Sequence, residues 1–310
     1  MLNGRISAGN ARTLSSDVRN GRWSEVENWL RTVADQAAGK GCDRVLVSSE
    51  WLLDAFSGDN RLVEFSRRLN GLGDHSILLL LLLRDPVNQL ISLYKHRAKA
   101  GSAGSIDEWV AGGYELPRKL KGIRQQQQGS GVELFARSYG NQRGDLERLF
   151  FEEWLGMPVP DDAAGLLVNP SLSLSELVLL RRLRACHPGL VACLYERLLA
   201  IDPGLKTEGK AMGEYARNVA INAVAVHADE WQHWNGVLPQ SERLQIPQPG
   251  PEPGREPDSL ELSASQLGSV MQLLAETATP GFILRLFWSW RLRPALSRIK
   301  WSIWPWRARR

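Results

Sequence analysis

An unbroken apolar run, SILLLLLL at residues 76–83, is the feature that most constrains the fold. It is far shorter than the ~20 apolar residues that a transmembrane helix needs. It also lacks the alternation of polar and apolar residues that marks a strand with one solvated face. A continuous run of this length is typical of a strand buried on both faces of a parallel sheet, and helices must cover those faces. The run therefore predicts an α/β domain.

Two other segments fit the same sheet. DRVLVSS, at residues 43–49, has the same continuous apolar character, and VELFARSY, at 132–139, is a weaker third strand. A helical pattern covers residues 25–38, and RLVEFSRRL links the first two strands. Ser105 and Glu108 have the spacing of a capping box, which predicts a helix start at IDEWVAGG. The alternation predicts a parallel sheet with flanking helices, and the amphipathic patterns farther on predict a helical C-terminal half.

The residues directly after the leucine run combine a charge with a helix start. Arg84 follows the run, Asp85 can cap a helix, and Pro86 suits a first turn. The helix would bury a stripe of Val87, Leu90, Ile91 and Tyr94 and expose Asn88, Ser92, Lys95 and Lys99. Ligands of open parallel sheets bind beyond the carboxyl ends of the strands, so Arg84 is a candidate anion-binding residue. A helix cap with a local ion pair is the alternative, and spacing alone leaves both open.

Positive charge is concentrated at the end of the chain. Residues 281–310 hold seven Arg, one Lys and five of the twelve Trp, with no acidic residue. The other 280 residues carry 30 basic against 34 acidic side chains, a net charge of −4, so no nucleic-acid partner is expected. The tail has the composition of a helix that lies at an anionic membrane surface. Docking on the protein and a nucleic-acid arm stay open as alternatives.

Compartment and domain boundaries follow from simpler signals. The three Cys are scattered and form no CxxC pair, and the first residues lack the apolar core of a secretory signal. We therefore expect a cytoplasmic protein, peripheral at the inner membrane face through its tail.

Residues 246–258 contain five Pro and two Gly, which predicts an extended linker. The predicted organisation is a domain over 1–245, this linker, and a helical segment with the tail over 259–310.

The segment LLLRDPVNQLISLYKHR resembles the 3′-phosphate-binding segment of sulfotransferases that use 3′-phosphoadenosine 5′-phosphosulfate (PAPS). Arg84 and Ser92 match its arginine and serine, and Tyr94 matches a common aromatic. The ordered set VLVSSEWL, VELFARSYG, GDLERLFFEEWLG and NPSLSLSELVLLRRL is similar to bacterial carbohydrate-type members, over roughly residues 44–185. The resemblance implies a P-loop NTPase-like fold, PAPS as sulfuryl donor, and a hydroxyl of a carbohydrate or other acceptor as its target.

One element of the family pattern is missing. The Lys-x-Gly-Thr-Thr loop that grips the 5′-phosphosulfate, together with the strand before it, has no match in this sequence. In related folds that strand lies in the middle of the sheet, where its loss leaves backbone groups unpaired. We expect either that the start is truncated or that a degenerate relative completes its sheet in another way. Inactivity of the chain as written is therefore an open alternative, and so is a non-catalytic nucleotide-binding or membrane-associated scaffold.

Candidate catalytic residues stand at the end of the first predicted strand. Glu50 is the best-placed carboxylate for the active site, and Ser49 is its neighbour. A cap on the helix WLLDAF is an equally good interpretation of the same residues.

The segment VHADEWQHW invites a metal hypothesis because it places two His beside two acidic residues. Its spacing matches no HExxH helix, so we predict no metal site. Trp231 and Trp234 fit ordinary packing or a surface that stacks on sugar rings.

Overall fold

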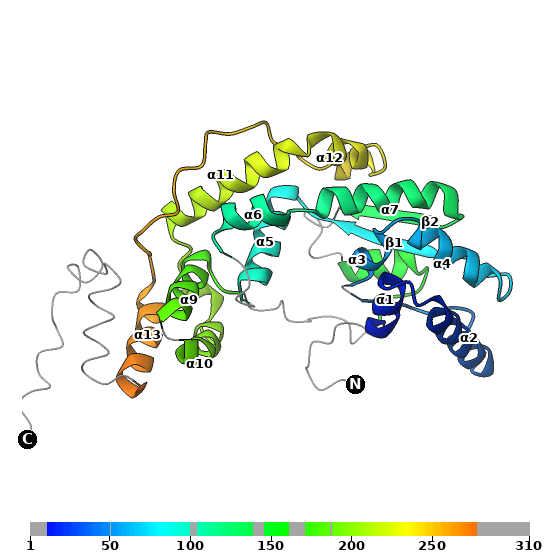
Figure 1. The fold of residues 1–310 in the computed structure, drawn as a ribbon, viewed down its shortest axis with the longest axis horizontal. Helices are drawn as coiled ribbons and strands as arrows, with labels where there is room; N and C mark the ends of the chain where they lie inside the picture. The colour runs from blue at the N-terminus through cyan, green and yellow to red at the C-terminus, as the bar shows by residue number, and fades with distance from the viewer. Residues whose placement is uncertain are drawn as a thin grey trace, which may run out of the picture. The chain divides into compact units, whose positions relative to one another are not determined.

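The computed structural model of the chain describes residues 11–49, 51–99, 104–138, 146–160, 171–186 and 188–277. They form mostly helices, with a small parallel sheet of two strands (Figure 1). The chain divides into two compact units, each built from separate stretches of sequence. The first unit comprises the described residues of three segments, Met1–Asp85, Glu115–Asp162 and His227–Gln245. The second unit comprises the described residues of Pro86–Tyr114, Ala163–Val226 and Ile246–Arg310.

The first unit contains both strands and the helices around them. Its elements are α1 (Arg12–Arg19), α2 (Trp23–Gly39), α3 (Leu52–Phe56), α4 (Arg61–Asn70), β1 (Leu78–Leu83), α7 (Leu116–Ser130), β2 (Glu133–Ser138), α8 (Leu146–Arg148), the π-helix η2 (Leu149–Trp154), α12 (Ala228–Asn235) and the 3₁₀ turn η4 (Gln240–Glu242).

The two strands run side by side and parallel (Figure 1). Leu78 lies opposite Glu133, and Leu83 lies opposite Ser138. The chain turns into β2 at Gly131, which ends α7 with a φ of 69°, a left-handed conformation that glycine adopts without a steric cost. A mostly helical chain with a parallel sheet agrees with the α/β expectation. The finer assignment to a P-loop NTPase-like sulfotransferase fold stays a prediction.

The prediction of a buried strand at residues 43–49 is wrong. This segment is irregular apart from a single β-bridge at Ser49, and Val45 and Leu46 are 47% and 43% exposed. Burial of β1 is also less complete than expected, since Leu78 is exposed and only Leu83 is fully buried. A strand needs neighbours for its backbone N–H and C=O groups, and composition alone cannot show whether those neighbours are present.

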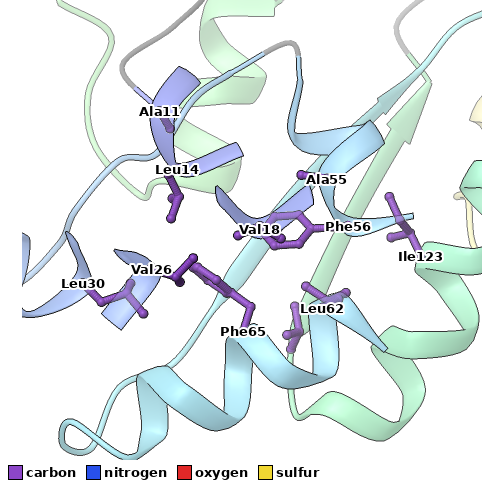
Figure 2. Close-up of a cluster of buried hydrophobic side chains, with 11 residues drawn as sticks. Ala11, Leu14, Val18, Val26, Leu30, Ala55, Phe56, Leu62, Phe65 and Ile123 are labelled. Carbon is purple, nitrogen blue, oxygen red and sulfur yellow. The ribbon is translucent and has the colours of Figure 1, made fainter. Parts of the chain in front are cut away.

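Eleven buried apolar residues form the core of the first unit: Ala11, Leu14, Val18, Val26, Leu30, Ala55, Phe56, Leu62, Phe65, Ile123 and Val132. Figure 2 shows side chains from α1, α2, α3, α4 and α7 converging on this cluster. Leu14 and Val18 are four residues apart on α1, which places them on one helix face. The rings of Phe56 and Phe65 meet edge to face at 5.2 Å. The core thus fixes the helices that flank the sheet.

The second unit is helical throughout its described part. Its elements are α5 (Pro86–Lys99), α6 (Ile106–Gly113), α9 (Leu174–Cys186), α10 (Pro188–Leu199), the 3₁₀ turn η3 (Pro203–Leu205), α11 (Lys210–Val226) and α13 (Ala264–Thr277).

Local sequence signals are confirmed in this unit. The capping box at Ser105 is present, since its Oγ accepts from the Glu108 N–H at 3.5 Å and its own N–H donates to Glu108 Oε2 at 2.9 Å. The apolar stripe of α5 is confirmed as well, with Val87, Leu90 and Tyr94 buried. Both patterns depend only on residues within one or two helical turns, which is why sequence alone could predict them.

The Pro-rich segment at 246–258 lies within the second unit. It has neither helix nor strand, and side chains of two helices fix its backbone. Asn222 on α11 donates to the Pro251 carbonyl at 2.9 Å, and Arg182 on α9 donates to the Pro257 and Asp258 carbonyls at 2.9 and 2.7 Å. The unit boundary falls at Gln245, at the start of this segment, and α13 beyond it packs with α9 and α10 around the buried Leu273.

None of the helices in the described part of the chain is long and apolar enough to cross a bilayer. The tail at 281–310, for which we predicted a membrane-surface helix, lies outside the described residues.

Candidate functional site

Arg84 stands at the carboxyl end of β1, directly after Leu83. Because Leu83 lies opposite Ser138, the carboxyl ends of both strands meet at one edge of the sheet. The Arg84 side chain is half-buried, and it forms no hydrogen bond or ion pair within the described residues. Arg84 therefore forms no ion pair with Asp85, but Asp85 has a partner of its own, so the helix-cap alternative stays open. The guanidinium keeps its donors available for an anion.

The end of β2 is different, because its arginine is neutralised. Arg137 Nε lies 3.5 Å from Glu153 Oε2 and 3.7 Å from Glu242 Oε1, and its guanidinium lies over the Phe135 ring. Glu242 also accepts a hydrogen bond from the Ser138 N–H at 2.9 Å. Two carboxylates thus face this arginine, and one of them, Glu153, also pairs with Arg148 at 2.7 Å. No sequence pattern indicated this cluster, because Glu242 is 104 residues away from Ser138.

Ser92 belongs to the second unit, whereas Arg84 belongs to the first. Ser92 is exposed on α5, on the polar face that we predicted. On the same face, Lys95 Nζ pairs with Glu208 Oε2 at 2.8 Å, and the other Glu208 oxygen accepts from the Leu174 N–H at 2.6 Å. Lys95 is therefore engaged within its own unit, whereas Ser92 keeps its hydroxyl at the surface.

Tyr94, the aromatic residue of the segment LLLRDPVNQLISLYKHR, is a buried hydrogen-bonding residue of the second unit. Its hydroxyl donates to the Gly104 carbonyl at 3.0 Å and accepts from Arg181 Nη1 at 3.4 Å. Burial raises the pKa of Tyr94 to about 12. The phenol therefore stays protonated at neutral pH and acts as a hydrogen-bonding core residue.

A second phenol nearby completes a polar network that sequence reasoning missed. Tyr215 on α11 donates to Asp107 Oδ1 on α6 at 2.5 Å. Burial alone would raise the pKa of Asp107, but hydrogen bonds from Ser105 and Tyr215 outweigh it and hold this pKa below its ordinary value. The network ties α6 to α11, and the only local signal for it was the capping box at Ser105.

Ser49, one of the two candidate catalytic residues, accepts hydrogen bonds from backbone N–H groups a few residues farther along the chain. Its Oγ accepts from the Trp51 N–H at 3.2 Å, and its carbonyl accepts from the Leu52 N–H at 3.2 Å. These bonds satisfy backbone donors of Trp51 and Leu52, but the N-cap of α3 is Trp51, without a side-chain cap hydrogen bond, so both interpretations stay open. Glu50, the other candidate, lies outside the described residues.

Of the two interpretations of the tryptophans on α12, the structure confirms ordinary packing and not a sugar-stacking surface. Trp231 and Trp234 are fully buried, so neither ring can stack on a sugar. His227 Nδ1 lies 3.8 Å from Glu230 Oε2 in the turn that begins the helix. Over the described residues, no group of three or more His, Cys, Asp or Glu side chains could hold a metal ion.

Comparison with known proteins gives no relative: no protein-family model matches the chain, and neither does any curated protein or any solved structure.

Proposed function

We propose that this protein is a sulfotransferase that transfers a sulfuryl group from PAPS to a hydroxyl of a carbohydrate-type acceptor. The observation that carries the proposal is Arg84. It stands at the end of a parallel strand, directly before a helix, and has no counter-charge within the described residues. Sequence resemblance supports the same assignment, since Arg84 matches the arginine that binds the 3′-phosphate of the donor.

In this reaction the sulfuryl group passes directly from donor to acceptor, so the protein mainly positions the two substrates. The acceptor's hydroxyl oxygen forms a bond to sulfur while the bond from sulfur to the 5′-phosphate oxygen breaks, and adenosine 3′,5′-bisphosphate leaves. Arg84 holds the donor by its 3′-phosphate and so positions it. The hydroxyl proton needs a base, for which Glu50 is our candidate from the sequence. Ser49 is a poor candidate for direct participation, because its hydroxyl already accepts from the backbone.

A non-catalytic role is the second candidate. The specific observation in its favour is the missing Lys-x-Gly-Thr-Thr loop, without which the 5′-phosphosulfate has no partner in the sequence. Such a protein would bind nucleotide through Arg84 and act as a nucleotide-binding or membrane-associated scaffold.

We also propose that the tail at 281–310 binds an anionic membrane surface. Its eight basic residues and five Trp, with no acidic residue, support this.

Transfer is tested by incubating the chain with PAPS and a panel of saccharides and measuring released adenosine 3′,5′-bisphosphate. Acceptor-dependent release is expected, and Arg84→Ala should abolish it. Arg31→Ala is the matched control, since Arg31 is an exposed arginine on α2 that forms no ion pair within the described residues. Binding of the bisphosphate without release would favour the non-catalytic candidate. Neither binding nor release by the folded chain would contradict both.

A further inference from the structure

Trp51 lies between two arginines on the surface of the first unit. The guanidinium carbons of Arg12 and Arg19 lie 5.9 and 5.5 Å from the centre of its indole ring. Both arginines come from α1, seven residues apart, so they share one helix face. Trp51 as a whole residue is 37% exposed, which is high for a tryptophan, and both arginines are exposed as well. These three side chains form what we name the α1 surface.

The charge of the α1 surface is not neutralised. Neither Arg12 nor Arg19 forms an ion pair within residues 11–49 or elsewhere in the described part of the chain. The one acidic residue on α1, Asp17, is buried, and it accepts from Arg22 Nε at 2.8 Å. The exposed face of α1 is therefore basic, and an anionic partner would meet no opposing carboxylate from this helix.

Apolar side chains are exposed in the same stretch of sequence. Val45, Leu46 and Trp51 all fall within seven residues, and each belongs to the large apolar residues that remain at least 37% exposed. Isolated exposed apolar residues are common on protein surfaces, and three in one short segment are compatible with contact to an apolar layer. A bilayer interface offers such a layer beside its charged headgroups.

We infer that the α1 surface docks on a bilayer that contains anionic lipids. Arg12 and Arg19 would pair with headgroup phosphates and carboxylates, and Trp51 would enter the interfacial layer. Stacking on a sugar ring fits less well, because guanidinium groups already lie over the indole. A nucleic-acid partner fits less well too, because the first 280 residues carry a net charge of −4.

The inference does not rest on sulfuryl transfer. It adds a second membrane contact to the one proposed for the tail at 281–310. Stable membrane anchoring usually takes two weak signals, and the α1 surface would supply one of them.

The test is co-sedimentation of the full chain with vesicles of phosphatidylcholine and phosphatidylserine, compared with phosphatidylcholine alone. We expect Arg12→Gln/Arg19→Gln to weaken partitioning to the anionic vesicles by about thirtyfold, since each basic residue near such a surface contributes about fivefold. The control is Arg67→Gln/Arg197→Gln, which removes the same net charge from ion-paired positions. Circular dichroism checks that both variants fold. Trp51→Ala should weaken partitioning, and Trp51→Phe should weaken it less.

The inference would be overturned if Arg12→Gln/Arg19→Gln partitioned to the anionic vesicles as strongly as the control variant. The same result would follow if the tail alone provided all the binding. A heparin column is the second arm. Loss of heparin binding with unchanged vesicle binding would assign the α1 surface to a polyanionic glycan and would likewise overturn it.

Discussion

The two strands of the sheet end at the same edge, but the arginines at their carboxyl ends differ in their partners. Arg137, near the end of β2, lies between Glu153 and Glu242 and over the Phe135 ring. Arg84, at the end of β1, has no hydrogen bond or ion pair to any described residue. A half-buried arginine loses part of its hydration. Carboxylates of the protein compensate for this loss at Arg137, whereas no described carboxylate does so at Arg84. The contrast separates an arginine that holds the fold from one that is available to a ligand.

The largest effect in this comparison is expected from Arg137→Ala. It would leave Glu153 and Glu242 without their shared cation, and within the described residues only Glu153 would keep another ion-pair partner, Arg148 at 2.7 Å. Arg137 and Glu242 are half-buried and Glu153 is exposed, so we expect a loss of about 3 kcal/mol in the free energy of unfolding, at the lower end of the range for breaking a buried ion pair. Urea denaturation followed by circular dichroism measures it. A loss below about 0.5 kcal/mol would show that Arg137 is as dispensable for stability as we expect Arg84 to be.

A somewhat smaller loss is expected from Glu242→Gln, about 2 kcal/mol. This change weakens the acceptor of the Ser138 N–H and removes one of two charges beside Arg137, while Glu153 remains. Equilibrium unfolding in urea provides the value, and Glu153→Gln, whose carboxylate is more exposed, is the control with the smaller expected loss. Equal losses for both variants would contradict the special position of Glu242.

The smallest effect on stability is expected at the ion pair of Glu64 with Arg67, which gives a reference value for the larger losses expected at Arg137 and Glu242. The hydrogen bond from Arg67, opposed by burial and assisted by Arg68, lowers the pKa of Glu64 to about 2 from 4.5. Because the folded pKa is the lower one, the stabilisation is complete above pH 4.5 and is lost as the pH falls towards 2. Glu64→Gln should therefore cost about 0.5 kcal/mol at pH 7 and almost nothing at pH 2. Unfolding measured at both pH values would test this, and a pH-independent loss would refute it.

Much of the local structure was predictable from the sequence, and the reasons are physical. The strand at β1, the capping box at Ser105 and the apolar stripe of α5 each depend on residues within a few positions of one another. The failed strand at 43–49 has the composition of a buried strand, but its burial depends on a neighbour that composition does not report. The sequence left Trp231 and Trp234 open between ordinary packing and a sugar-stacking surface for a similar reason, since their exposure is set by packing against other segments, including α7.

The candidate site was predictable only in part. Arg84 was found because its charge interrupts an apolar run, and its lack of a counter-charge is a structural fact that no spacing could give. The cluster at Arg137 was missed because its two carboxylates come from distant segments. The surface around Trp51 was missed because arginines on α1 and an indole 32 or more residues farther along meet only in the folded chain.

The most direct test of the account compares the two arginines by calorimetry with adenosine 3′,5′-bisphosphate, at a temperature where all variants are folded. We predict micromolar binding by the wild-type chain and by Arg137→Ala. Arg84→Ala should bind roughly a hundredfold more weakly or not at all, since each hydrogen bond to a charged group contributes about 1.5–3 kcal/mol. Its unfolding free energy should change by less than about 0.5 kcal/mol. Unchanged affinity of a folded Arg84→Ala variant, or no binding by the wild-type chain, would contradict the assignment of Arg84 as the anion-binding residue.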